Sequence, residues 1–143
     1  MEINKSAPAL ATHELLINAP VQRIWSLVAD MNNWPGWNPA VKSAKLNGAF
    51  EVGTTFNWTS GGISIVSTLQ EIQLTTKLVW TGKAIGTRAI HVWSLQPTSA
   101  GVLVITSESF EGWLVTLMRK AMQKTLDESL VAWLNQLKRQ AEE

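Results

Sequence analysis

His91 and Glu108 are the two residues of this chain best suited to acid–base chemistry. A histidine titrates near neutral pH, and a carboxylate beside it can orient the ring so that it acts as a general base. One register of the two strands that carry them places His91 opposite Glu108 and Trp93 opposite Thr106. A shift by one residue would instead bring His91 together with Ser107. The sequence alone leaves both registers open.

In the first register, one face of this strand pair mixes large rings with a histidine and a carboxylate. Its members are His91, Trp93, Leu95, Val104, Thr106, Glu108 and Phe110. An unpaired charge is costly in a solid core, so the mixture favours a cavity that holds water or a ligand. Two alternatives stay open: an outer face on which both groups are solvated, or a buried hydrogen-bonded pair that ties two strands together. No third catalytic group accompanies the pair, so its catalytic role remains a candidate.

Large flat and flexible apolar side chains are candidates for the wall of such a cavity. The chain has eight tryptophans and no tyrosine. Tryptophan offers a large apolar surface with a single N–H donor, and methionine adapts to varied apolar shapes. The predicted ligand-binding residues are Trp37, Phe56, Trp58, Trp80, His91, Trp93, Thr106, Glu108, Phe110, Met118 and Met122. Plain core packing is an alternative explanation for the rings and the methionines.

Seven strands are predicted to position these side chains. Turn signals such as Asn47-Gly48 and Gly61-Gly62 separate stretches of strand character. The predicted strands span residues 12–18, 41–46, 54–59, 63–72, 77–81, 87–96 and 102–110. Only the first two have helical sequence between them, so the sheet is predicted to be mostly antiparallel.

Helical periodicity marks the segment after the first strand and the C-terminal segment. Pro20 is predicted to begin a helix with one apolar stripe formed by Val21, Ile24, Trp25 and Val28. The proline- and asparagine-rich residues 30–39 allow only a short helix or turn. From residue 113 to about 141, apolar side chains recur every three to four residues without proline or glycine. This pattern predicts one long helix whose apolar face the sheet covers.

Composition excludes several classes of function. The 143 residues fit one domain, predicted at 12–143 after an N-terminal arm at 1–11. A formal net charge of +1 with scattered basic residues gives no argument for nucleic acid binding. Without cysteine and with two histidines, the chain is predicted to need no metal and no cofactor. Short apolar runs predict no stable membrane insertion. The expected location is cytoplasmic, and the expected state is a monomer or a dimer.

The order of several short motifs resembles that of a known family. Ala19-Pro20 precedes a helix with Trp25, and a W-x-x-W-x-P loop spans Trp34–Pro39. An H-x-W-x-L-x-P pattern starts at His91, and an E-x-F-x-G pattern starts at Glu108. Together these motifs are similar to the polyketide cyclase/dehydrase and lipid-transport (SRPBCC) group of the START-like superfamily, over about residues 12 to 140. One departure is Ala100-Gly101-Val102, where many relatives have Gly-Thr in the last hairpin.

The resemblance implies a helix-grip fold of the α+β class, like that of birch pollen allergen. In this fold a seven-stranded curved antiparallel sheet wraps around a long C-terminal helix, with two short helices between the first and second strands. Family members place the matching histidine and glutamate toward the cavity, which supports the register that pairs His91 with Glu108.

Three functions fit these observations. The favoured one is binding or transport of a hydrophobic small molecule, because aromatic faces point inward and no full catalytic constellation is visible. The first alternative is a cyclase or dehydratase that uses His91 and Glu108 on a polyketide-like substrate. The second is a protein-binding module that presents the loop Trp34–Pro39 to a partner.

Overall fold

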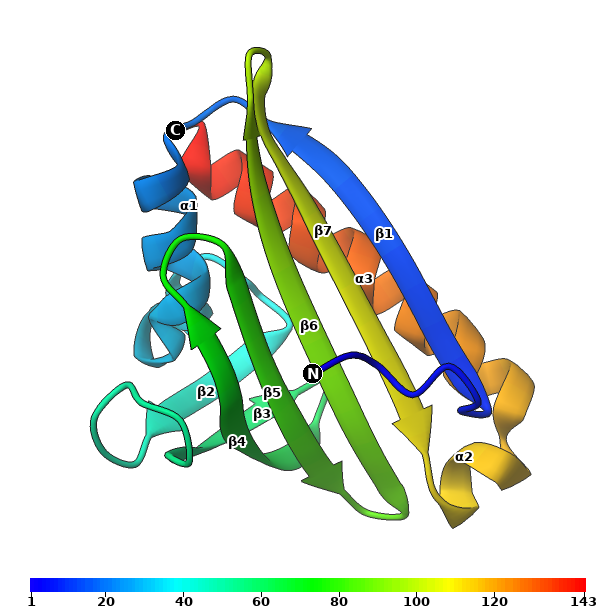
Figure 1. The fold of residues 1–143 in the computed structure, drawn as a ribbon. Coiled ribbons are helices and arrows are strands. Elements are labelled where there is room, and N and C mark those ends of the chain that lie inside the picture. The colour runs from blue at the N-terminus through cyan, green and yellow to red at the C-terminus, as the bar shows by residue number, and fades with distance from the viewer.

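The computed structural model describes residues 1–143 and contains a single sheet of seven antiparallel strands (Figure 1). The strands lie in the spatial order β1-β7-β6-β5-β4-β3-β2, so β1 and β2 form the edges. Their bounds are β1 Ala9–Ile17, β2 Val41–Leu46, β3 Thr55–Ser60, β4 Ile63–Gln73, β5 Lys77–Ala84, β6 Thr87–Thr98 and β7 Gly101–Glu111. Register shifts in the β2–β3 and β4–β5 pairs mark bulges that help the sheet to bend.

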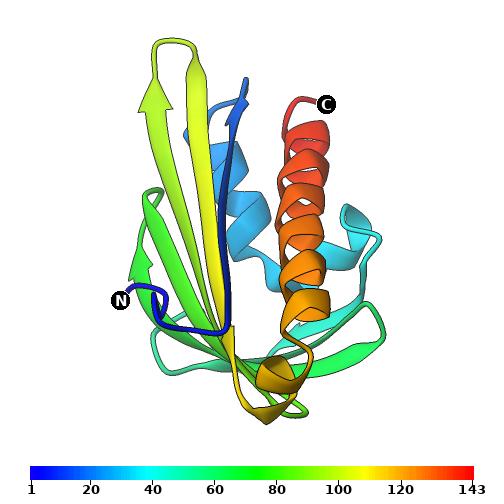
Figure 2. The same cartoon turned by 90° about the vertical axis from the view of Figure 1, so that its right-hand side faces the viewer.

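The helices lie on the inner face of this sheet and at one end of it. They are α1 Val21–Ala29, the 3-10 helix η1 Met31–Gly36, α2 Trp113–Leu117 and α3 Arg119–Ala141. Helix α3 runs along the sheet, and α2 lies beneath the lower ends of both (Figure 2). This is the predicted α+β helix-grip architecture, with α1 and η1 between the first two strands. None of the helices is both long and apolar enough to span a membrane.

The first strand begins earlier than the sequence predicted. Strand β1 starts at Ala9 rather than Thr12, because Ala9 pairs with Phe110 and Ala11 with Glu108 on β7. Both alanines are buried in a small cluster with α2 and α3. The N-terminal arm is thus shorter than residues 1–11, and its Asn4 backbone N–H donates to the Ser109 hydroxyl.

The prediction of one unbroken C-terminal helix was wrong at Met118. Its backbone (φ −115°, ψ 42°) separates α2 from α3. The break has a tertiary cause: the Leu114 N–H donates to the Gly86 carbonyl oxygen (3.1 Å), which ties α2 to the β5–β6 turn. The predicted apolar stripe is therefore uncovered at its start, where Leu117 is 75% and Met118 48% exposed.

The main core fills one end of the space between the sheet and α3. Trp34, carried by η1, lies at its centre and is fully buried. Its ring lies 5.1 Å from Trp133 on α3 and 5.2 Å from Trp58 on β3, measured between centroids, both in edge-on geometry. The Trp34 indole N–H donates to the Val28 carbonyl oxygen, so the ring buries no unpaired donor. We call this the closed end.

Candidate functional site

The opposite end of the same space is hollow. A cavity of about 330 Å³ lies between β3–β7, α2 and α3. Eleven of its 18 lining residues are hydrophobic. Ile63 and Ile85 line it and are themselves 48% and 72% exposed, which places the mouth at the β3–β4 and β5–β6 turns beside α2. This volume falls in the range of small-molecule sites. We call this the open end.

The cavity exists because inward-facing side chains shrink along β5 and β6 toward the mouth. Cross-strand pairs on this face run from Leu78–Trp93 through Trp80–His91 to Gly82–Ala89. The first of these pairs is fully buried, whereas Gly82 and Ala89 line the cavity. A Cβ at Gly82 would lie 3.2 Å from the Ser67 hydroxyl, so even one methyl group would crowd this wall.

The β6–β7 register matches the predicted pairing. His91 lies opposite Glu108 and Trp93 lies opposite Thr106. His91, Trp93, Thr106 and Glu108 are all buried on the inner face, which excludes the solvated outer face as an explanation. The shifted register with Ser107 is likewise excluded, since Ser107 pairs with Val92.

His91 stands in the wall behind the cavity. Its Nε2 lies 2.8 Å from the Thr106 hydroxyl, and its ring lies between those of Trp80 and Trp93 at centroid distances of 4.8 and 5.4 Å. Burial lowers the pKa of His91 to about 3, because a charged ring would lose its hydration. The imidazole is therefore neutral at physiological pH, and its Nδ1 has no hydrogen-bond partner.

Glu108 reaches the cavity itself. Burial raises its pKa to about 8, and no other group offsets that effect. Its Oε2 lies 3.5 Å from His91 Nδ1, a distance that would suit an ion pair if the glutamate gave its proton to the ring. Burial penalises both charges, so we assign the pair as neutral, with Glu108 as a carboxylic acid. Such an acid presents one O–H donor to an apolar cavity.

Five of the predicted ligand-binding residues come together on the cavity. They are Trp58, Trp80, Glu108, Phe110 and Met122. The Trp58 indole N–H donates to the Ser67 hydroxyl (3.0 Å), so this tryptophan has its polar group satisfied by the protein. The cavity wall is accordingly apolar around one acid.

The other six predicted residues lie elsewhere. Phe56, Trp93 and Thr106 are fully buried, and His91 is 1% exposed in the wall, so none of these four lines the cavity. Trp37 borders a separate, mostly polar surface hollow near the end of α3. Met118 lies on the surface at the helix break because α2 turns toward the β5–β6 turn.

Small residues of the cavity wall were missed. Examples are Gly82, Ala84 and Ala89 on the strands and Thr125 and Ser129 on α3. The signal that could have found them is their inward position in the alternation of β5 and β6, one or two steps beyond the large rings. These small residues leave the cavity empty, whereas the predicted residues were chosen for their large apolar side chains.

Two other kinds of site find no support in the geometry. No three His, Asp or Glu side chains lie together in an arrangement that could hold a metal ion. Trp34 and Trp37, which made the loop Trp34–Pro39 a candidate partner surface, are 0% and 8% exposed. The loop thus presents its tryptophans to the core and not to a partner.

The fold and the cavity together define a helix-grip protein with an internal, largely apolar chamber. The model of the polyketide cyclase / dehydrase and lipid transport family matches residues 8–142. The chain belongs to this family, part of the START-like superfamily, as its motifs predicted. A comparison with curated protein sequences finds no match.

Solved structures agree on the fold at low sequence identity. A hypothetical protein from Helicobacter pylori is 16% identical with a TM-score of 0.86, covering 96% of this chain and 90% of that one. The Zhui aromatase/cyclase from a Streptomyces species is 13% identical with a TM-score of 0.82, covering 93% of each chain. A START superfamily protein from Mycobacterium smegmatis is 15% identical with a TM-score of 0.72, covering 91% of this chain and 97% of that one.

Proposed function

We propose that this protein binds and carries a hydrophobic small molecule that has one hydrogen-bond acceptor. The observation that supports this most is the open end: an apolar cavity of about 330 Å³ with the buried, uncharged acid Glu108 in its wall. The apolar wall favours any molecule that loses water on entering. A carbonyl or hydroxyl oxygen on that molecule would accept the Glu108 proton in a hydrogen bond.

The ligand classes that fit are lipids, polyketide-like ring systems and other aromatic molecules. Trp58 and Trp80 offer ring surface on the sheet side, and Met122 offers an adaptable apolar contact from α3. Lys83 near the mouth is the only basic side chain in the wall, so a charged group on the ligand would stay at the entrance.

The test is to identify what the protein retains when it is purified from cells. Mass spectrometry should detect an apolar molecule that co-purifies with the wild type. The molecule should be absent from Ala89→Phe, whose phenyl ring fills the cavity. Thr12→Phe is the matched control, because it adds a phenyl ring at an exposed position on β1, away from the cavity. Equal retention by wild type and Ala89→Phe would contradict the proposal.

A second candidate function is acid-catalysed ring closure or dehydration in the same cavity. The observation that favours it is the His91–Glu108 pair, in which the acid faces the cavity and the base lies 3.5 Å behind it. Glu108 would protonate the leaving hydroxyl as water departs, and its carboxylate would then take the proton lost from the substrate carbon, which restores the acid; His91 would orient the carboxyl group. If Glu108→Gln turns over a polyketide-like substrate at the wild-type rate, this candidate is wrong.

A further inference from the structure

The mouth of the cavity carries an unusual share of the exposed apolar side chains. Ile63, Ile85, Trp113, Leu117 and Met118 are between 48% and 75% exposed. Ile63 begins β4 and Ile85 lies in the β5–β6 turn, and the other three belong to α2 and the break that follows it. Most other large apolar side chains are buried, including seven of the eight tryptophans. Trp113 is the exception, and it packs against Gly86 of the β5–β6 turn.

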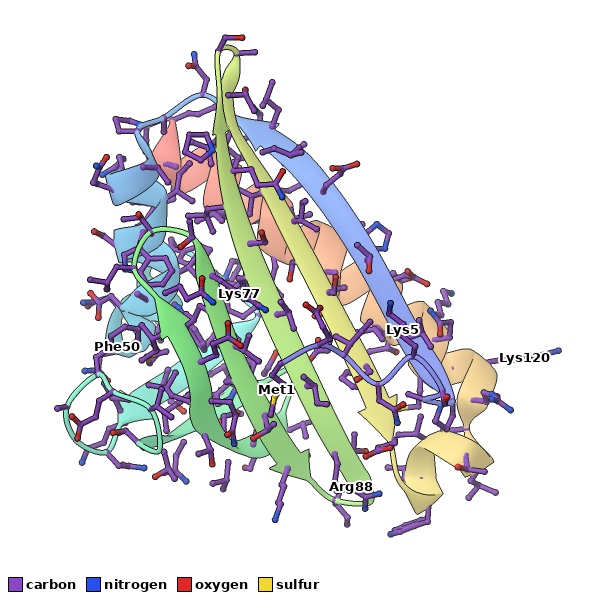
Figure 3. All side chains as sticks on the ribbon, viewed as in Figure 1. Met1, Lys5, Phe50, Lys77, Arg88 and Lys120 are labelled. Carbon is purple, nitrogen blue, oxygen red and sulfur yellow. The ribbon has the colours of Figure 1, made fainter.

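Positive charge gathers around the same segments. Lys83 and Arg88 flank the β5–β6 turn, and Arg119 and Lys120 begin α3 directly after the break. Figure 3 shows Arg88 at the lower edge of the molecule, beside the β5–β6 turn, and Lys120 at the right-hand side, where α3 begins. The carboxylate of Glu111, which is partly exposed, lies 3.5 Å from Arg88.

The net charge of +1 for the whole chain does not reveal this uneven distribution of charge. Residues 83–88 and 111–120, which frame the mouth, carry four cations and one carboxylate, so the rest of the chain is net negative. A second copy of the chain would bring the same positive charge to the mouth and repel it. A surface that is apolar, basic and led by an exposed tryptophan is complementary to a bilayer with anionic headgroups.

We propose that the open end docks on an anionic lipid bilayer, with Trp113, Leu117 and Ile85 entering the headgroup boundary. The basic rim then contacts lipid phosphates, and the cavity mouth faces the acyl chains. This inference rests on the proposed function. It adds that the membrane is the place where the ligand enters or leaves the cavity. It requires contact with the membrane surface and no spanning helix.

Vesicle flotation with the full chain and no added ligand tests this inference. The wild type should float with phosphatidylcholine vesicles that contain about a third phosphatidylglycerol, and far less with phosphatidylcholine alone. Leu117→Glu should weaken partition on the order of tenfold, since it puts a charge where an apolar side chain enters the boundary. Lys120→Glu should weaken it by roughly fivefold or more.

Matched controls separate the mouth from general surface effects. Leu74→Glu changes a leucine that is 71% exposed in the β4–β5 turn, at the far ends of those strands from the mouth. Lys45→Glu changes an exposed lysine on β2. Both controls should float like the wild type, within about twofold. Ala89→Phe should also float normally, so that loss of ligand binding and loss of docking can be told apart.

Three results would overturn the inference. The first is no binding of the wild type to either kind of vesicle. The second is an equal effect of the mouth variants and their controls. The third is a dimer of the free protein that Leu117→Glu dissociates, which would make a second copy the occupant of this surface.

Discussion

The closed and open ends of this molecule are built from the same strands and the same helix, yet one is solid and the other hollow. At the closed end, Trp34 from η1 fills the space between Trp58 and Trp133. At the open end, the positions that continue β5 and β6 hold Gly82 and Ala89. No element comparable to η1 enters there, because α2 caps the end from outside.

The difference shows that side-chain size along β5 and β6 determines where the cavity of this protein lies. His91 and Glu108 lie at the boundary between the two ends. His91 faces the packed rings and is neutral, whereas Glu108 faces the cavity and keeps its proton. Burial at this boundary keeps both groups uncharged, and the Glu108 acid is the member of the pair that can donate a hydrogen bond in the cavity.

Removing the central ring of the closed end should have the largest effect. Trp34→Ala should lower the free energy of unfolding by about 4 kcal/mol, because it leaves a cavity among four aromatic neighbours. Urea denaturation measures this change. Trp113→Ala removes the same side chain where it is 65% exposed and should change stability by less than about 1 kcal/mol. Equal losses in the two variants would break the contrast between the ends.

The buried acid should make stability depend on pH. The folded chain keeps the Glu108 proton up to a pKa of about 8, whereas the unfolded chain loses it near 4.5. The folded state therefore binds the extra proton, and stability falls as pH rises through this window. The lowered pKa of His91, about 3 against 6.5, acts in the opposite direction below pH 6.5, where unfolding takes up a proton.

Between pH 6.5 and 8, His91 no longer contributes and Glu108 alone makes stability depend on pH. Over this range the free energy of unfolding should fall by about 2 kcal/mol at most. Denaturation across this range should show a fall in stability for the wild type and none for Glu108→Gln. Glu111→Gln, on the same strand but partly exposed, should keep the wild-type slope. The same slope in Glu108→Gln would mean that Glu108 is ionised in the folded protein.

Substitutions that add a larger side chain at each end should have smaller effects on stability than Trp34→Ala. Val104→Phe overfills the closed end, where Val104 is fully buried, and should destabilise by about 1–2 kcal/mol. Ala89→Phe adds more atoms but extends into the cavity, so its cost should stay below about 1 kcal/mol. Thermal unfolding of both variants gives the comparison, and a larger loss for Ala89→Phe would mean that the open end is not free space.

The sequence predicted the fold well because local patterns determined it. Turn signals between stretches of strand character identified all seven strands, and the apolar stripe of α1 is confirmed by buried Ile24, Trp25 and Val28. The break at Met118 could not be predicted, since it depends on a hydrogen bond between Leu114 and Gly86. Such a contact joins segments that only the folded chain brings together.

The site was predicted in part for a similar reason. Alternation tells which side chains face inward, but it left two registers open, and the family resemblance favoured the one that pairs His91 with Glu108. The alternation does not show at which position along the strands the packed core ends and the cavity begins. Phe56 and Trp93 face inward as predicted but lie at the closed end, where η1 fills the space. Where η1 inserts is a tertiary property.

The most direct measurement of the central claim compares two probes of nearly equal shape, acetylnaphthalene and ethylnaphthalene, in titrations at pH 6.5. The account predicts that the wild type binds the ketone more tightly by roughly fivefold to tenfold, because the Glu108 acid donates to its carbonyl. Glu108→Ala should lose this preference, and Ala89→Phe should bind neither probe. Equal affinity of the wild type for both probes would contradict the account.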